Sequence, residues 1–305
     1  MKHIFIINPE SGNAKSHEGL ENRISVVCES LGVEYSIFYT EHPGHAEQIV
    51  KDESAKSSDK VRFYACGGDG TVNEVVSGAV GCENAEFAVV PVGTGNDFVR
   101  TFSPDGSFLS LDDQLSGTPL RIDAVSAGER FFVNMLNVGF DSAVVDTISR
   151  LRDKSRLMRG NFAYIIGVLL NFFKMPKTTL SCEFDDGEKL EGEFLLSAFS
   201  NGKYYGGGFK AAASAEPDDG ILDVLFVRPC SRLVFLSLIS MYKKGTLLES
   251  KRSLKYVVFK KCRKAKVTFS PDSYVCIDGE IVSDHSFDIE VLPGAVSLSL
   301  PRSKK

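Results

Sequence analysis

Hydrophobic runs and amphipathic segments alternate over the first third of the chain. Short runs rich in β-branched residues predict strands at 2–7, 33–39, 61–66 and 86–90. Segments with apolar residues at helical spacing lie between them and predict helices at 19–31, 45–53 and 72–80. Alternating strands and helices are typical of a parallel sheet covered by helices. The pattern therefore predicts an N-terminal three-layer α/β domain at residues 1–118.

The pattern changes near residue 120, where strand signals outnumber helix signals. Strands are predicted at 120–125, 130–137, 178–184, 189–200, 221–227, 264–270, 274–277 and 287–292. Helices are predicted at 141–151, 161–173 and 231–243. Many strands with few crossover helices favour an antiparallel β-sandwich. We therefore predict a second domain at 119–293, with the tail at 294–305 able to pack back onto the first domain.

Length and composition agree with two domains. The chain has 305 residues, more than a single hydrophobic core usually serves. Its hydrophobic content of 43% and charged content of 25% match an ordinary globular protein. The net charge of −5 argues against a protein that coats nucleic acid, although it allows a local basic surface for an anionic membrane.

The cysteines and the apolar segments indicate the compartment. Seven scattered cysteines form no Cys-x-x-Cys pair, which argues against a disulfide framework or a zinc site. The N-terminal apolar run ends at Asn8-Pro9, too early for a signal peptide. The longest later apolar stretch, 162–173, is shorter than the roughly 20 residues that a bilayer crossing needs. We therefore expect a cytoplasmic protein in a reducing compartment.

Three segments have the layout of phosphate-binding loops, at 8–15, 67–73 and 91–97. In each, a strand ends, the chain turns through glycine and a helix begins, so free backbone N–H groups and the helix dipole face an anion. In a parallel sheet all three loops lie at the carboxyl ends of strands and converge. Each loop alone could be an ordinary glycine turn, but their coincidence favours phosphate binding.

An acidic side chain, Asp69, lies among the glycines of the second loop. Next to phosphate oxygens a carboxylate is repelled unless a divalent cation bridges them, so Asp69 implies Mg²⁺. The chain lacks both the Gly-x-x-x-x-Gly-Lys-Ser/Thr loop and the dinucleotide Gly-x-Gly-x-x-Gly pattern. Common NTPases and dehydrogenases are therefore disfavoured.

Two long motifs resemble the catalytic domain of diacylglycerol kinases, and in particular soluble bacterial lipid kinases similar to sphingosine kinases. They are Gly67-Gly68-Asp69-Gly70-Thr71-Val72-Asn73-Glu74-Val75 and Pro91-x-Gly93-Thr94-Gly95-Asn96-Asp97-Phe98-x-Arg100. Shorter matches extend the resemblance over most of the chain: Asn8-Pro9, Asp123, Asn137-x-Gly139-Phe140-Asp141, Asp218-Asp219-Gly220-x-Leu222-Asp223 and Asp278-Gly279-Glu280. The resemblance implies an active site in the cleft between the two domains.

The resemblance also implies roles for single residues. Asp69 would hold the catalytic Mg²⁺, and Glu280 would be the general base. A second, structural Mg²⁺ would bind Glu216, Asp219 and the backbone carbonyl of Ile221. Together with the three loops, the resemblance gives the candidate nucleotide-binding residues Asn8, Pro9, Ser11, Gly12, Lys15, Thr40, Gly67, Gly68, Gly70, Thr71, Gly93, Thr94, Gly95 and Asn96. A supporting network would contain Asp97, Arg100, Asp123 and Asp278.

Each of these residues also has a purely structural interpretation. By spacing alone, Glu280 would be a hairpin turn acid and Asp97 a helix cap. Residues 218–220 alone read as a tight turn. Lys15 and Arg100 could bind phosphate through their cationic side chains, or they could be ordinary solvated surface residues.

A basic segment at 150–159 is followed by the apolar helix at 161–173. That combination can rest on an anionic membrane surface, although a core helix with a charged approach loop has the same pattern. The expected partners are therefore a lipid substrate and the inner face of the membrane, without nucleic acid. Whether the chain forms a homodimer is left open.

The sequence favours an ATP- and Mg²⁺-dependent kinase that phosphorylates a hydroxyl of a lipid such as diacylglycerol, giving phosphatidic acid in phospholipid metabolism. One alternative is a kinase of soluble substrates related to NAD kinases and phosphofructokinases, which share the Gly-Gly-Asp-Gly element. Another is a non-catalytic nucleotide-binding module, which would be expected to lose Asp69 or Glu280. The sequence does not choose among lipid alcohols.

Overall fold

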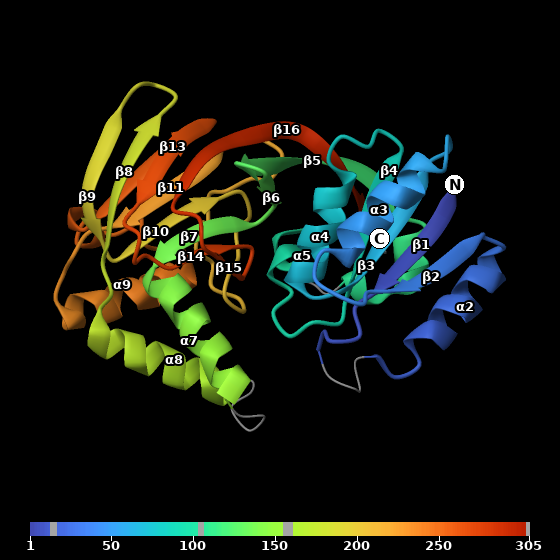
Figure 1. Cartoon of the computed structure of the whole chain (residues 1–305), viewed down its shortest axis with the longest axis horizontal. Helices are drawn as coiled ribbons and strands as arrows, with labels where there is room; N and C mark the ends of the chain where they lie inside the picture. Colours follow the sequence, from blue (N-terminus) through green and yellow to red (C-terminus); the bar gives the residue numbers. More distant parts are fainter. Residues whose placement is uncertain (13–16, 103–106, 155–160, 303–305) are drawn as a thin grey trace.

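The computed structural model describes residues 1–12, 17–102, 107–154 and 161–302, and Lys15 lies outside this range. The first part of the chain contains β1 Lys2–Ile7, α2 Leu20–Leu31, β2 Tyr35–Tyr39, α3 His45–Ala55, β3 Val61–Gly67, α4 Asp69–Ala79, β4 Ala85–Pro91, α5 Asp97–Phe102, the 3-10 helix η1 Ser107–Leu109 and α6 Leu111–Leu115. Figure 1 shows these elements as one lobe, joined to a second lobe by the long strand β16, Ser286–Leu300.

The second part of the chain contains β5 Thr118–Ala127, β6 Arg130–Phe132, β7 Met135–Gly139, α7 Phe140–Lys154, α8 Asn161–Lys174, β8 Thr178–Phe184, β9 Lys189–Phe194, β10 Leu196–Ser200, β11 Leu222–Val227, α9 Arg232–Lys244, the 3-10 helix η2 Ser253–Lys255, β12 Val257–Cys262, β13 Lys264–Phe269, β14 Val275–Ile277 and β15 Glu280–Val282, followed by β16. Helices α7, α8 and α9 lie together beside the strands of this lobe (Figure 1).

The N-terminal domain is a parallel sheet in the order β2-β1-β3-β4. Successive side chains of a strand point to opposite faces. Ile4 and Ile6 therefore pack with residues of α3 and α4, while Phe5 and Ile7 pack with residues of α2 and α6. Helices cover both faces of the sheet, which confirms the predicted three-layer α/β domain.

The C-terminal domain is a β-sandwich, as predicted. One layer contains β16, β13, β8 and β9, and the other has the order β12-β11-β10-β7-β14-β15. The pairings within each layer of the sandwich are antiparallel. Phe194, Phe199 and Phe226 are fully buried in one core with residues of both layers. The strands alternate apolar and polar positions because only one face of each layer meets this core.

Strand β16 belongs to both domains. Residues Ser286–Glu290 pair with β13, residues Ile289–Leu300 pair with β5, and Leu298 meets Phe87 of β4. Accordingly, Phe287 lies in the sandwich core, whereas Leu298 lies in the core of the N-terminal domain. In Figure 1 the strand arches across both lobes. A shared strand couples the two lobes more firmly than a flexible linker would.

Two predicted strands are each interrupted. The prediction at 130–137 was wrong about continuity because the Val133 and Asn134 N–H groups turn to the Asp278 carboxylate, which separates β6 from β7. The prediction at 189–200 was also wrong, since the chain passes at Leu195 from one layer of the sandwich to the other. Strands β12 and β15 and the short helix α6 were not predicted.

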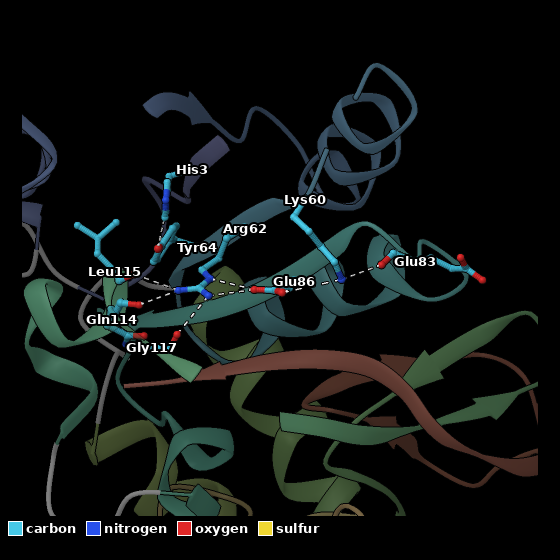
Figure 2. Close-up of polar contacts among 9 residues, drawn as sticks. All are labelled: His3, Lys60, Arg62, Tyr64, Glu83, Glu86, Gln114, Leu115 and Gly117. Atoms are coloured by element: carbon cyan, nitrogen blue, oxygen red, sulfur yellow. Dashed lines mark hydrogen bonds and ion pairs between the residues drawn. The ribbon is translucent and has the colours of Figure 1, made fainter. Parts of the chain in front are cut away.

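A buried ion pair joins β3 to β4 at the end of the sheet away from the glycine loops. Arg62 Nη2 and Nε donate to Glu86 Oε2 at 3.0 and 3.2 Å, and both side chains are about nineteen-twentieths buried. The same guanidinium donates to the carbonyls of Gln114 and Leu115 at the end of α6 and of Gly117 just after it (Figure 2). This network fixes α6 to the sheet.

Replacing Glu86 with alanine is expected to lower the free energy of unfolding by about 3–5 kcal/mol, because it leaves a buried guanidinium without its counter-charge. The measurement is the first urea unfolding transition. The matched control is Glu83→Ala, which removes an exposed acid of the same domain and should change stability by less than about 0.5 kcal/mol. Equal effects of the two substitutions would contradict the role given to the pair.

Candidate active site

The three glycine loops meet at the carboxyl ends of β1, β3 and β4. Asn8 Nδ2 donates to Thr71 Oγ1 at 3.1 Å, which joins the first loop to the second. The N–H groups of Val92 and Gly93 both donate to the Gly67 carbonyl at 3.1 Å, which joins the second to the third. The structure thus brings together segments that the sequence separates.

Glycine is required where the second and third loops touch. A Cβ on Gly93 would lie 2.4 Å from the Gly68 Cα, and one on Gly67 would lie 2.2 Å from Thr71 Oγ1. Helix α4 begins at Asp69, earlier than predicted, and Gly68 at its N-cap has no side chain to satisfy the first N–H groups. Those groups are available to an anion.

The other candidate nucleotide-binding residues that the structure describes, which exclude Lys15, lie on or next to these loops. Ser11 N donates to the Asn8 carbonyl at 3.1 Å, and Thr40 N donates to the Ile7 carbonyl at 2.9 Å at the end of β2. Asn96 has a φ of 53° and donates through Nδ2 to the Gly93 carbonyl at 2.9 Å, which shapes the third loop. Their role in nucleotide binding stays a prediction.

Asp69 connects the second loop to the third. Its Oδ1 accepts a hydrogen bond from the Phe98 N–H at 2.9 Å, and its Oδ2 faces Gly95, where a Cβ would come within 2.9 Å. The carboxylate therefore caps helix α5, the role that the sequence alone suggested for Asp97. Its charge is held at the meeting point of the glycine loops.

Asp97 instead reaches across to the second domain. Its two carboxylate oxygens accept hydrogen bonds from the N–H groups of Gly207 and Gly208, both at 2.7 Å. Burial raises the pKa of Asp97, and these two N–H groups and Arg100 partly offset the effect. Arg100 lies 3.6 Å from Asp97 and also donates to the Gly95 carbonyl.

The partner of Asp97 is a tight hairpin at residues 205–209, which we call the glycine hairpin. Tyr205 and Phe209 exchange backbone hydrogen bonds at 2.9 and 2.8 Å, and Gly206 to Gly208 form the tip. Sequence reasoning missed this segment. The run of three glycines at 206–208 was the signal that could have found it, since three positive φ angles in succession demand glycine.

Asp278 holds the turn that carries Glu280. Its buried carboxylate accepts hydrogen bonds from three backbone N–H groups, at Val133, Asn134 and Met135, and from Asn73 Nδ2 of α4. Burial raises the pKa of Asp278 to about 6, and the four donors oppose that rise. The sandwich and helix α4 are therefore fixed to each other at this turn.

Glu280 begins β15 and lies against the second loop. A Cβ on Gly70 would be 3.9 Å from Glu280 Oε1. The residue also lines a cavity of about 240 Å³ together with Glu74, Glu129 and Arg130. Desolvation, and then the nearby Glu74 carboxylate, raise the pKa of Glu280, while Arg130 lowers it. Glu280 is a hairpin residue whose side chain is exposed beside the second glycine loop, and its role as the base stays a prediction.

Asp123 belongs to a different cluster. Its carboxylate accepts hydrogen bonds from Gly220 and Gly294, both at 2.7 Å, and it is fully buried. Its described contacts therefore connect the loop before β11 to the bend in β16, and they do not join it to Asp69 or Asp97. The described contacts of the expected network are thus divided among three places, around Asp97, Asp278 and Asp123.

The predicted structural metal site lies near Asp123. Glu216 forms an ion pair with Lys203 at 2.9 Å, and Asp219 accepts a hydrogen bond from Ile221 N at 2.9 Å. Burial raises the pKa of Asp219. Within the described part of the chain, no group of three or more His, Cys, Asp or Glu residues could hold a metal ion. The ligand set stays a prediction.

An apolar cavity of about 300 Å³ lies between α7, α8, α9 and the glycine hairpin. Its lining residues are Phe140, Asp141, Val144, Val145, Ile148, Val168, Tyr205, Gly206, Phe209, Ile239 and Tyr242. Helix α7 packs against β15, which carries Glu280, and the tip of the hairpin bonds to Asp97. Elements of the candidate site therefore meet the cavity from two sides.

Comparison with known families gives two successive matches along the chain. Residues 2–127 match the diacylglycerol kinase catalytic domain. Residues 134–300 match the YegS C-terminal NAD kinase beta sandwich-like domain. Together the two matches cover nearly all of the described residues.

Relatives and solved structures agree with these matches. The chain is 29% identical to "Putative lipid kinase YtlR" of Bacillus subtilis, over 96% of this chain and 98% of that protein. It is 27% identical to a diacylglycerol kinase of the same organism, over 90% and 88%. A crystal structure described as a putative diacylglycerol kinase from Bacillus anthracis has the same fold, with a TM-score of 0.74 at 22% identity over 98% and 96% of the two chains.

Proposed function

Because this chain belongs to the family that joins a diacylglycerol kinase catalytic domain to a YegS C-terminal beta sandwich-like domain, we propose that it is an ATP-dependent lipid kinase. The reaction would transfer the γ-phosphoryl group of ATP to a hydroxyl of a lipid alcohol such as diacylglycerol. The names of its Bacillus subtilis relatives, "Putative lipid kinase YtlR" and "Diacylglycerol kinase", support that choice.

The apolar cavity beside the site carries the proposal. A pocket for a soluble dinucleotide would need several polar groups to fix its ribose and phosphates, whereas this lining is mainly aliphatic and aromatic. Acyl chains suit such a lining because burial of apolar surface favours binding. Contact of the cavity walls with β15 and Asp97 supports its assignment to the acceptor substrate.

The glycine loops would hold the phosphates of ATP. Uncapped N–H groups at the start of α4 and the close backbone packing of Gly68 and Gly93 suit an anion that must approach the main chain. Asp69 fits the role of a Mg²⁺ ligand, because its carboxylate lies between two of these loops and accepts only one backbone hydrogen bond among its described contacts. When bound, Mg²⁺ would neutralise charge on the phosphate oxygens.

Glu280 would act as the general base. As the lipid hydroxyl oxygen bonds to the γ-phosphorus, the bond from that phosphorus to the bridging oxygen of ADP breaks, and ADP leaves with the electron pair. The hydroxyl proton passes to the Glu280 carboxylate. The raised pKa of Glu280 suits a proton acceptor that works near neutral pH.

The test is an ATP-consumption assay of the purified chain with lipid alcohols in mixed micelles. Diacylglycerol, phosphatidylglycerol, a sphingoid base and an isoprenoid alcohol form the panel, and NAD is the soluble control. Formation of ADP that depends on a lipid alcohol supports the proposal. Phosphorylation of NAD alone would assign the chain to the soluble-substrate class, and the absence of turnover with every acceptor would favour a nucleotide-binding module.

We also propose that the chain meets the membrane through an exposed apolar surface on α8 and α9, the membrane face. It consists of Leu169, Leu170, Phe173, Leu233 and Leu236. Arg232 Nη2 donates to the Phe173 carbonyl at 2.8 Å, so the end of α8 is fixed to the start of α9. No helix of the described residues is long and apolar enough to cross a bilayer.

We propose that the membrane face binds an anionic lipid surface, because the charges of the two are complementary. Arg232 and Lys174 are exposed beside the apolar side chains, and cationic residues next to apolar ones favour the lipid–water interface. The contribution of the basic segment at 150–159 stays a prediction, and Arg150 within it is ion-paired with Asp146. Arg156 and Arg159 lie outside the described residues, and nothing is described of the Arg152 side chain.

Replacing Leu170, Phe173 and Leu233 together with serine is expected to weaken binding to anionic vesicles by at least about tenfold, since each side chain inserts apolar area into the interface. Co-sedimentation with vesicles measures the effect. Binding by the wild-type chain should also fall as salt rises from about 0.05 to about 0.5 M. The control is Leu109→Ser, an apolar side chain that is 70% exposed on the other domain. Unchanged binding by the triple variant would rule out the membrane face.

A further inference from the structure

Strand β2 forms a free edge of the larger sheet. In the described part of the chain it pairs with β1 alone, and Figure 1 shows β2 and α2 on the side of their lobe away from the sandwich. Residues Tyr35–Tyr39 are half-buried or exposed, whereas residues 3–7 of β1 are buried throughout. An edge strand presents a row of unpaired backbone groups, to which another strand can add.

The backbone groups that point outward from β2 follow from its pairing with β1. His3 N donates to the Glu34 carbonyl at 3.1 Å, and Thr40 N donates to the Ile7 carbonyl at 2.9 Å. Even-numbered residues of this segment therefore bond to β1, because bonding to one side alternates along a strand. The N–H and C=O groups of the odd-numbered residues point away from β1; these residues are Tyr35, Ile37 and Tyr39.

Every other free edge among the described strands has a feature that discourages pairing. Strand β9 carries Lys189, Glu191 and Glu193, and strand β12 carries Lys260 and Lys261. Strands β6 and β15 are only three residues long. Charged side chains and short length are common means of protecting an edge strand. Strand β2 reads Tyr-Ser-Ile-Phe-Tyr, without charge or proline, so its edge is open to a partner strand.

The edge of β2 is complementary to the same edge of a second copy. An antiparallel pairing about a two-fold axis at Ile37 sets Ile37 opposite Ile37 of the second copy, and Tyr35 opposite Tyr39. All the outward-pointing residues then form hydrogen-bonded pairs, in which the two residues exchange both N–H···O bonds. Aromatic and β-branched residues directly opposite each other stabilise such a strand pair.

One position of the axis pairs the whole strand. With the axis at Ile37, all five residues of β2 are paired. An axis at Ser36 would leave Tyr39 beyond the paired segment, and an axis at Phe38 would leave out Tyr35. The register is therefore specified by the strand itself.

The surroundings of the strand also suit this pairing. Glu34 would face Thr40 of the second copy. Glu41 would face Val33, so no like charges meet. The two α2 helices would become neighbours on the same face of the sheet, and Leu31 is 47% exposed although it lies on the core-facing stripe of α2. A specific dimer buries at least about 1,200 Å² in total, so contact between these helices is needed besides the paired strands.

We propose that the chain forms a symmetric homodimer in which β2 of two copies pairs antiparallel about Ile37. The two sheets become one continuous sheet, and the same surface of each copy forms the interface, as a two-fold axis requires. The second copy is the partner because only a strand of this sequence reproduces the self-matched register. The proposal concerns assembly and does not depend on which acceptor is phosphorylated.

Light scattering after size-exclusion chromatography tests the assembly. The wild type should have the mass of two 33.3 kDa chains. Ile37→Lys places two like charges opposite each other on the axis, and should raise the dissociation constant of the dimer by at least about tenfold. The matched control is Leu109→Lys, which adds the same charge at a 70% exposed apolar position of the same domain and should leave the dimer unchanged. Circular dichroism checks that each variant is folded.

Oxidative cross-linking tests the register and does not depend on the folding of Ile37→Lys. Ile37→Cys places two thiols on the axis, where Cα atoms of a hydrogen-bonded pair lie about 5.5 Å apart, within disulfide range. This variant should become a covalent dimer on non-reducing gels. Ser36→Cys is the matched control, because its Cα atoms would be diagonal neighbours about 7–8 Å apart and should link at least about tenfold less. The wild type, with its seven free cysteines, gives the background.

Three results would overturn the proposal. The first is a wild-type chain that remains monomeric at about 100 μM, a concentration at which a specific dimer should form. The second is a folded Ile37→Lys protein that dimerises as tightly as the wild type, which would place the interface elsewhere. The third is cross-linking of Ile37→Cys no greater than that of Ser36→Cys.

Discussion

Replacing Asp69 with asparagine is expected to lower kcat for phosphoryl transfer by at least about 10³-fold while the protein stays folded. The amide keeps an oxygen that can accept the Phe98 N–H, so the cap of α5 survives. The substitution removes the negative charge of Asp69 between the second and third glycine loops, and a divalent cation needs that charge. ATP-consumption assays over a Mg²⁺ titration measure the loss.

Two comparisons make this result specific. Asp112→Asn removes an exposed acid of the same domain and should leave kcat unchanged. Asp69→Ala removes the capping oxygen as well as the charge, so it should melt earlier than Asp69→Asn at equal inactivity. If Asp69→Asn retained activity within tenfold of the wild type, the assignment of Asp69 to the cation would be wrong.

Local features of the site were predictable from the sequence because they depend on a few neighbouring residues. The three glycine loops follow from strand ends, glycines and helix starts, and the structure brings these loops together. Close packing explains the spacing, since a side chain on Gly67 or Gly93 would overlap atoms of the second loop. The two-domain fold was predictable for the same reason, because hydrophobic periodicity is a local signal.

Contacts between distant segments were not predictable in the same way. Asp97 looked like a helix cap, but its partners are Gly207 and Gly208, 110 and 111 residues further along the chain. The cap of α5 is Asp69, which accepts the N–H of Phe98 from 29 residues earlier in the chain. Neither the sequence around Asp97 nor that of the glycine hairpin contains a local signal that identifies the other as its hydrogen-bond partner. The same holds for the apolar cavity, which requires three helices and a hairpin to come together.

The shared strand shows how a local signal can mislead. Pro293 and Gly294 follow the predicted strand at 287–292 and normally end one. In the structure β16 runs from Ser286 to Leu300 with an irregular register between Leu292 and Val296. The Gly294 N–H at this bend donates to Asp123. Pro293 and Gly294 therefore form a bend within the strand and do not end it. The buried Asp123 carboxylate accepts a hydrogen bond from the backbone N–H that the sheet leaves unpaired.

Replacing Glu280 with glutamine is expected to lower kcat by about 10²- to 10⁴-fold, because the amide has the shape of the side chain without its basicity. ATP affinity should change little, since the glycine loops belong to the other domain. Steady-state kinetics with a lipid acceptor and direct ATP binding separate the two quantities. Glu129→Gln removes another acid that lines the same cavity and should have little effect on kcat.

The pH dependence gives a second test of the base. A general base must be deprotonated, so wild-type kcat should fall as the pH drops through the pKa of Glu280, which desolvation and Glu74 place above the usual glutamate value. Glu280→Gln should lose this acidic limb. Glu280→Asp keeps the carboxylate but withdraws it by one methylene, and misplacement by about 1 Å can lower the rate roughly 10²-fold. A Glu280→Gln protein that bound ATP poorly, or melted much earlier than the wild type, would show that Glu280 maintains the β14–β15 hairpin and is not the base.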